Sequence, residues 1–262
     1  MSSNFTSDAP NLESAPSQPA PAPAQRVLAH PVHTLLLVAL LLGNSWLTAR
    51  VMGGGHHLGN RVDEYIGTII LQLILIGYIW LGLRFRRIPF RELIGQRWKS
   101  FEDFALDIAI AAAFWFASAL MLGLLKFAFH MADKQSVQQQ IKSLQLIAPQ
   151  TVKELVVFLV VVLIAGVCEE IIFRGYLQKQ FAALFRNLPL GIIISALLFG
   201  AAHGYQGPKM MVLLGIYGAM FGILAALRKS LIPGMIAHGW QDALSGVGLW
   251  FLARHPDLLP FK

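Results

Sequence analysis

Long apolar stretches, separated by short polar segments, make up most of this chain. A helix of about 20 mostly apolar residues is long enough to cross the hydrocarbon core of a bilayer. Seven stretches of about this length can be counted, at 32–52, 65–83, 104–125, 153–173, 188–206, 209–227 and 231–252. The pattern therefore predicts an all-α fold, a polytopic transmembrane bundle of about seven to eight helices.

Composition supports the lipid bilayer as the main surrounding of the protein. The chain is 56% hydrophobic and only 13% charged, whereas soluble domains carry roughly 25% charged residues. The net charge of +7 is spread between the apolar stretches, so nucleic acid is not an expected partner. Cys168 is the only cysteine, which excludes an intramolecular disulfide and a metal site built from several cysteines.

The polar segments indicate how the chain sits in the membrane. Residues 1–28 are rich in Ser, Pro and Ala and predict a disordered cytosolic tail. The loop after the second stretch is strongly basic, which is typical of the cytosolic side. Its basic residues are Arg84, Arg86, Arg87, Arg91, Arg97 and Lys99. We therefore expect a multi-pass integral membrane protein with its amino terminus in the cytosol.

Ionisable residues inside the fourth stretch form the first candidate for a functional site, since such residues are costly in lipid. Glu170 and Arg174 are four residues apart, so they share a helix face and can form a structural ion pair. Glu169 is rotated by about 100° from Glu170 and is expected to face a cavity. The alternative is that these charges reach the membrane surface at a helix end.

Two further polar groups lie in the later apolar stretches. His203 ends the run Phe199–His203, and His238 and Asp242 are four residues apart on one helix face. Each group alone also fits a polar contact between helices or a bond to a backbone carbonyl. Together with Glu169, the two histidines can activate water and stabilise an oxyanion, as amide hydrolysis requires.

The meeting of these groups depends on the length of the fourth helix. Counting spans separately puts Glu169 near the inner end of its helix and His203 near the outer end of the next. The segment 174–186 is too polar to span alone, and it predicts either a continuation of the fourth helix or an amphipathic helix at the membrane surface. Continuation would let the groups converge between the cytosolic half and the midplane of the membrane.

Three motifs in this order, Glu169-Glu170-x-x-x-Arg174, Phe199-x-x-x-His203 and His238-x-x-x-Asp242, resemble those of the CAAX-processing and bacteriocin-processing (ABI or CPBP) family of intramembrane proteases. The resemblance implies a bundle with a buried active site, in which Glu169 and His203 activate water while His238 and Asp242 stabilise the oxyanion. It divides the chain into the tail 1–28, N-terminal transmembrane helices 29–149, a catalytic core 150–253 and a C-terminal tail 254–262.

One position departs from the family pattern, because Asp242 stands where Asn is commoner. An ionised aspartate has no proton to donate to an oxyanion. Asp242 could act when protonated, orient His238, or help to bind a metal.

The cofactor is a second open point. The resemblance implies zinc as one alternative, since members of this family are often labelled metalloproteases. Glu169, His203 and His238 are zinc ligands by residue type. The chain has no H-E-x-x-H motif, so we favour a glutamate-type peptidase without a cofactor.

The preferred function is hydrolysis of a peptide bond in a membrane-anchored peptide or protein, with the active site opening to the cytosolic side. The resemblance implies a prenylated CAAX substrate, and a leader peptide is equally compatible with the residues. Two alternatives remain from other classes of protein. One is a non-catalytic immunity or scaffold protein, and the other is a proton-coupled transporter, because intramembrane Glu, His and Asp also form proton relays.

Overall fold

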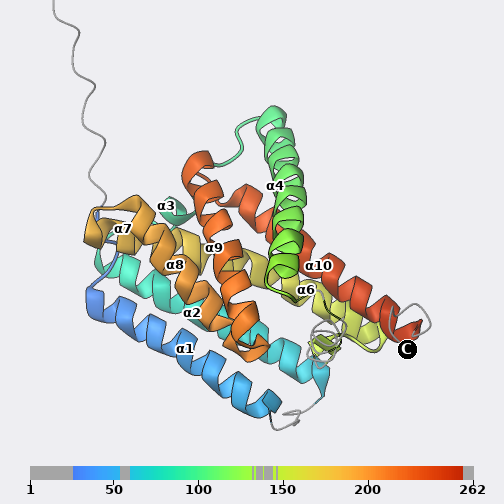
Figure 1. The fold of residues 1–262 in the computed structure, drawn as a ribbon. Helices are drawn as coiled ribbons and strands as arrows, with labels where there is room; N and C mark the ends of the chain where they lie inside the picture. Colours follow the sequence, from blue (N-terminus) through green and yellow to red (C-terminus); the bar gives the residue numbers. More distant parts are fainter. Residues whose placement is uncertain are drawn as a thin grey trace, which may run out of the picture.

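The computed structural model describes residues 26–53, 60–131, 133, 138, 144, 145 and 147–255. Within these residues the prediction of an all-α fold is confirmed (Figure 1). The longer helices are α1 (Pro31–Gly53), α2 (Arg61–Phe85), α4 (Phe101–Ala128), α6 (Val152–Glu169), α8 (Leu188–Ala202), α9 (Pro208–Arg228) and α10 (Ile232–Arg254). The shorter ones are α3 (Arg91–Ile94), the π-helix η1 (Glu170–Gln178), α7 (Lys179–Phe185) and the 3₁₀-helix η2 (Gly204–Gln206).

Five helical segments of the described chain are long and apolar enough to cross a membrane. They are Pro31–Val51, Arg61–Phe85, Phe101–Ala128, Val152–Phe185 and Pro208–Arg228. The prediction of an integral membrane protein with several spans is confirmed. Two of the seven predicted spans are not among these five segments. Helix α8 ends at Ala202 and is too short, and α10 is less apolar because it carries His238 and Asp242.

Side-chain caps explain where several helices begin. The side chains of Asn60, Ser100, Thr151 and Asn187 each accept a hydrogen bond from the backbone N–H three residues later. Thr151 also forms a reciprocal capping box with Glu154. Such caps satisfy backbone donors that have no partner inside the helix, and they fix the start of the helix that carries Glu169.

The fourth predicted span continues without a break from α6 through η1 into α7. This confirms the continuation of the fourth helix and makes a 34-residue apolar segment, Val152–Phe185. In η1 the backbone bonds are of the i→i+5 type, a rare arrangement that is frequent at functional sites. All nine residues of η1 are buried, and Glu170 and Arg174 lie within it.

Close packing of α9 against η1 depends on small residues. Arg174 donates to the carbonyl of Gly218, and Gln178 donates in the same way to Gly222, four residues further on in both helices. A Cβ atom at Gly222 would lie 2.6 Å from Gln178 Oε1. Glycine therefore lets the two backbones approach closely enough for these bonds, as small residues do between membrane helices.

A hydrophobic core fills the end of the bundle where α1 begins and α2 ends. Its largest members are fully buried and come from α1, α2, α3, η1 and α8. They are Leu37, Ile79, Leu83, Leu93, Ile172, Tyr176, Leu177 and Phe199. Gln180 ties the start of the chain to this core, because its amide bonds to the backbone of Leu28 and Ala29.

The described chain thus starts inside the predicted tail. Leu28 is buried, and Arg26 pairs with Glu92, so the packed structure begins before the expected boundary at residue 28. The rest of that tail, residues 1–25, and residues 256–262 of the predicted C-terminal tail lie outside the described residues.

Candidate active site

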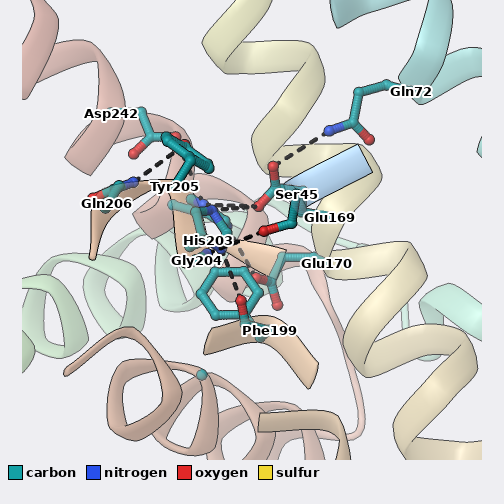
Figure 2. Close-up of polar contacts among 12 residues, drawn as sticks. Ser45, Gln72, Glu169, Glu170, Phe199, His203, Gly204, Tyr205, Gln206 and Asp242 are labelled. Carbon is teal, nitrogen blue, oxygen red and sulfur yellow. Dashed lines mark hydrogen bonds and ion pairs between the residues drawn. The ribbon is translucent and has the colours of Figure 1, made fainter. Parts of the chain in front are cut away.

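Four residues predicted from the motifs lie together in the structure. Glu169 ends α6, His203 follows the last residue of α8, and His238 and Asp242 come from α10. Glu169 Oε2 lies 4.0 Å from His203 Nε2 and 3.8 Å from His238 Nε2. His238 Nε2 is also 3.6 Å from Asp242 Oδ2. Side chains from three helices therefore converge at one point, which Figure 2 shows for Glu169, His203 and Asp242.

The second glutamate of the first motif has a different environment. Glu170 and Arg174 are each 1% exposed, and Arg174 Nη1 donates to Glu170 Oε1 over 3.0 Å. The guanidinium also stacks on the rings of Phe199 and Phe221, with its carbon 4.4 and 5.0 Å from their centroids. The predicted pairing of Glu170 with Arg174 is thus present, and it is completely enclosed by protein.

The buried ion pair also fixes the ring of His238. Glu170 Oε1 lies 3.1 Å from His238 Nδ1. Because a carboxylate only accepts, Nδ1 is the protonated nitrogen in this contact, and Nε2 faces Glu169 and Asp242. The pair of Glu170 and Arg174 therefore acts as the support on which His238 is oriented.

A backbone carbonyl sets the tautomer of His203 in the same way. His203 Nδ1 lies 2.8 Å from the carbonyl oxygen of Phe199, so Nδ1 carries the hydrogen and Nε2 of the neutral ring is an acceptor. Nε2 faces Glu169 Oε2, which is also an acceptor and is buried without a hydrogen-bond partner among the described residues. Two acceptors in this position need a donor between them.

One water molecule meets this requirement. Its two O–H groups can donate to Glu169 Oε2 and to His203 Nε2 at about 2.8 Å each. With the two hydrogen bonds about 90° apart, the accepting atoms stand about 4 Å from each other, as the 4.0 Å distance requires. The arrangement can therefore hold a water molecule against a general base.

A cavity of about 630 Å³ adjoins this point. Its walls come from α1, α2, α6, η1 and the turn after α8, and most of the lining side chains are apolar, as is usual for ligand cavities. Glu169 and His203 lie in its wall, and it extends to Val51 near the end of α1 and to Asp63 at the start of α2. We call this space the α1–α2 chamber.

The α1–α2 chamber lies away from the basic loop. It reaches the first turn of α2, whereas Arg84, Arg86 and Arg87 lie at or just beyond the last turn of the same helix. The hydrophobic core described above fills the bundle at the basic end. The chamber and the basic loop therefore lie towards opposite ends of α2.

Comparison with known proteins supports the motif assignment. Residues 151–244 match the family model of type II CAAX prenyl endopeptidase Rce1-like proteins. This segment is similar to the Rce1-like family. No curated protein and no solved structure matches the chain. The match over residues 151–244 supports a CAAX-type intramembrane protease.

The Rce1-like segment runs from the cap of α6 to the first half of α10 and contains all three motifs. Helices α1, α2 and α4 lie outside it. The α1–α2 chamber is therefore built partly by the Rce1-like segment and partly by helices that the family match does not cover.

Zinc fits these residues poorly as they stand. Tetrahedral zinc at about 2.0–2.1 Å from its ligands brings the ligand atoms to about 3.4 Å from each other. The distances from Glu169 Oε2 to the two Nε2 atoms, 3.8 and 4.0 Å, are longer. Within the described part of the chain, no group of three or more His, Cys, Asp or Glu residues has an arrangement that could hold a metal ion.

Three residues that the sequence reasoning missed complete the site. Gln72 of α2 donates to Glu169 Oε1 over 3.3 Å, and Ser45 of α1 bonds to Ala201 and Gly204 on either side of His203. Tyr205 lies in the chamber wall, where burial raises its pKa to about 12, so the phenol keeps its proton. The only sequence signal is for Gln72, a single amide within the apolar run Ile69–Ile74.

Proposed function

We propose that the chain is a glutamate-type intramembrane endopeptidase that hydrolyses a peptide bond of a membrane-anchored protein. The observation that carries this proposal is the pair of facing acceptors, Glu169 Oε2 and His203 Nε2, in the wall of the α1–α2 chamber. A buried carboxylate oxygen without a partner is costly. Its presence beside a second acceptor supports a site for the attacking water.

The positions of these atoms support the following reaction. Glu169 takes a proton from the water while His203 Nε2 accepts the other O–H, and the water oxygen attacks the carbonyl carbon of the substrate. The carbonyl oxygen becomes an oxyanion. His238, doubly protonated beside the carboxylates of Glu170 and Asp242, donates to it through Nε2. Glu169 then returns its proton to the leaving amine, and the peptide bond breaks.

Asp242 is placed to act on His238 rather than on the water. Its Oδ2 atom is 3.6 Å from His238 Nε2, while its side chain is 38% exposed. An ionised carboxylate here favours the doubly protonated ring but cannot itself donate to an oxyanion. We therefore assign Asp242 the role of orienting His238.

The substrate must present a peptide bond next to an apolar segment. The mainly apolar walls of the chamber suit a lipid-modified or strongly apolar residue beside the bond that is cut. The name of the Rce1-like family points to prenylated CAAX sequences, and we propose these as the first substrate class to test. A leader peptide with an apolar segment is the second.

The test is cleavage of membrane-anchored peptides by the purified full-length protein in lipid. A fluorogenic farnesylated CAAX peptide and a fluorogenic leader peptide are compared, with Glu169→Gln and Glu92→Gln run in parallel. Glu92 carries the same chemical group in α3, outside the chamber. We expect the wild type and Glu92→Gln to cleave one of the two peptides, and Glu169→Gln to lose at least about 100-fold in rate.

Two results would contradict the proposal. One is the absence of cleavage of both peptides by wild-type protein that remains folded. The other is full activity of Glu169→Gln, which would show that a different group activates the water.

A further inference from the structure

Gln72 is a polar residue in the apolar middle of α2. It lies in the wall of the α1–α2 chamber, and its side-chain nitrogen Nε2 is 3.3 Å from Glu169 Oε1. Tyr65, Thr68 and Leu75 line the chamber from the same helix. Figure 2 shows Gln72 reaching Glu169 from the side opposite to His203. No residue of α2 belongs to the segment matched by the Rce1-like family.

The chemistry of the contact fixes which end of the amide faces the catalytic glutamate. A carboxylate only accepts hydrogen bonds, so the amino group of Gln72 must face Glu169 and its carbonyl oxygen must point elsewhere. That oxygen, Oε1, is buried and has no hydrogen-bond partner among the described residues. Gln72, which lines the chamber, therefore has one end engaged with Glu169 and a buried carbonyl oxygen without a partner among the described residues.

A buried carbonyl without a donor is unfavourable, and such an atom in a native protein calls for a partner or a role. The chamber is mostly apolar, so a substrate side chain entering it brings few donors. Every peptide residue other than proline, in contrast, brings a backbone N–H. An extended peptide whose carbonyl is attacked by the water at Glu169 places its neighbouring N–H groups within a few ångströms of this glutamate.

We propose that Gln72 is a bifunctional positioning residue, which holds Glu169 through its amino group and accepts a backbone N–H of the substrate through Oε1. This inference rests on the proposed peptidase function. The bond to Glu169 Oε1 leaves Oε2 directed at His203 and His238. The bond from the substrate would align the peptide with that same carboxylate, which couples binding to the position of the base.

The acceptor role is tested by pairing a change in the enzyme with a change in the substrate. A set of peptides is made in which one N–H at a time, on either side of the bond that is cut, is replaced by an ester oxygen. The enzyme variant is Gln72→Met, which keeps the length of the side chain but removes its hydrogen bonds. Wild type and variant are assayed in lipid as full-length proteins, and kcat and KM are determined separately.

We expect one ester position to lower kcat/KM of the wild type about tenfold, the loss typical of one good hydrogen bond. In Gln72→Met the same ester should cost less than about twofold, because the acceptor is gone. The variant should also show a lower kcat with the unmodified peptide, since Glu169 is no longer held. A role in folding alone would give no such dependence on a single substrate atom.

Tyr78→Phe is the matched control, because it removes a hydrogen bond of α2 to the backbone of His33, outside the chamber. It should respond to every ester as the wild type does. Equal losses in wild type and Gln72→Met at all positions would overturn the acceptor role, and an unchanged kcat of Gln72→Met would overturn the positioning role. Wild-type protein that cleaves none of the unmodified peptides would instead refute the peptidase function itself.

Discussion

Glu169 and Glu170 are neighbours in the chain, yet they approach opposite nitrogens of one imidazole ring. Glu169 Oε2 lies 3.8 Å from His238 Nε2, and Glu170 Oε1 lies 3.1 Å from His238 Nδ1. Their burial differs as well, because the side chain of Glu169 is 17% exposed and that of Glu170 is 1% exposed. Two adjacent carboxylates are thus divided between the chamber and the protein interior.

The first prediction concerns stability. Glu170→Gln removes the charge that balances Arg174 inside the protein, and a buried charge left without its partner costs about 3–5 kcal/mol. We expect this variant to unfold at a clearly lower temperature than the wild type in the same detergent. Glu169→Gln, at the chamber wall, should unfold close to the wild-type temperature. Equal unfolding temperatures for the two variants would contradict the division between the two glutamates.

The second prediction concerns Asp242. Asp242→Asn replaces a carboxylate that cannot donate with an amide that can, next to the position proposed for the oxyanion. Because the amide keeps the contact to His238 but loses the charge that favours its doubly protonated form, we expect Asp242→Asn to lower kcat less than Asp242→Ala, which should lower it about tenfold through loss of that contact. Steady-state kinetics with one peptide tests both variants. A drop of more than tenfold in Asp242→Asn would show that the negative charge itself is needed.

Most of the fold could be predicted from hydrophobic spans and caps, because length and polarity decide which segments cross lipid. The predicted first residues of two spans, 32 and 153, lie within one residue of the first residues of α1 and α6, Pro31 and Val152. The π-helix could not be predicted, since no residue pattern distinguishes Glu170–Gln178 from an α-helix. The length of the fourth helix could only be stated as one of two possibilities, because a polar stretch such as 174–186 also suits the membrane surface.

The candidate site was predictable where a motif supplied the residue. Glu169, His203, His238 and Asp242 are named by spacing and by their charge in apolar surroundings, and the structure brings them together. Gln72 was not predictable as a partner of Glu169, because the two residues lie 97 positions apart in the sequence, on different helices. The chamber could not be inferred either, since a cavity depends on which side chains fail to fill the space between α1 and α2.

The third prediction concerns metal. If the water is activated by Glu169 and His203 alone, a strong chelator should leave the rate of peptide cleavage unchanged after long incubation. The long distances from Glu169 Oε2 to the two imidazoles, 3.8 and 4.0 Å, are the basis of this expectation. The assay compares untreated protein, protein treated with the chelator, and treated protein to which zinc has been added back. Loss of activity with recovery on addition of zinc would contradict the glutamate-type assignment.

The last prediction concerns the side of the membrane on which the chamber opens. Asp63 lies in the chamber wall, and Arg86 follows the opposite end of the same spanning helix. Cysteines introduced at the two positions, with Cys168 replaced by Ser, should therefore react with a membrane-impermeant maleimide from opposite sides. The positive-inside rule puts Arg86 in the cytosol, so Asp63→Cys should react from outside, which would place the chamber mouth on the non-cytosolic face. Reaction of Asp63→Cys only from the cytosol would instead restore the cytosolic opening and show that the basic loop does not set the orientation.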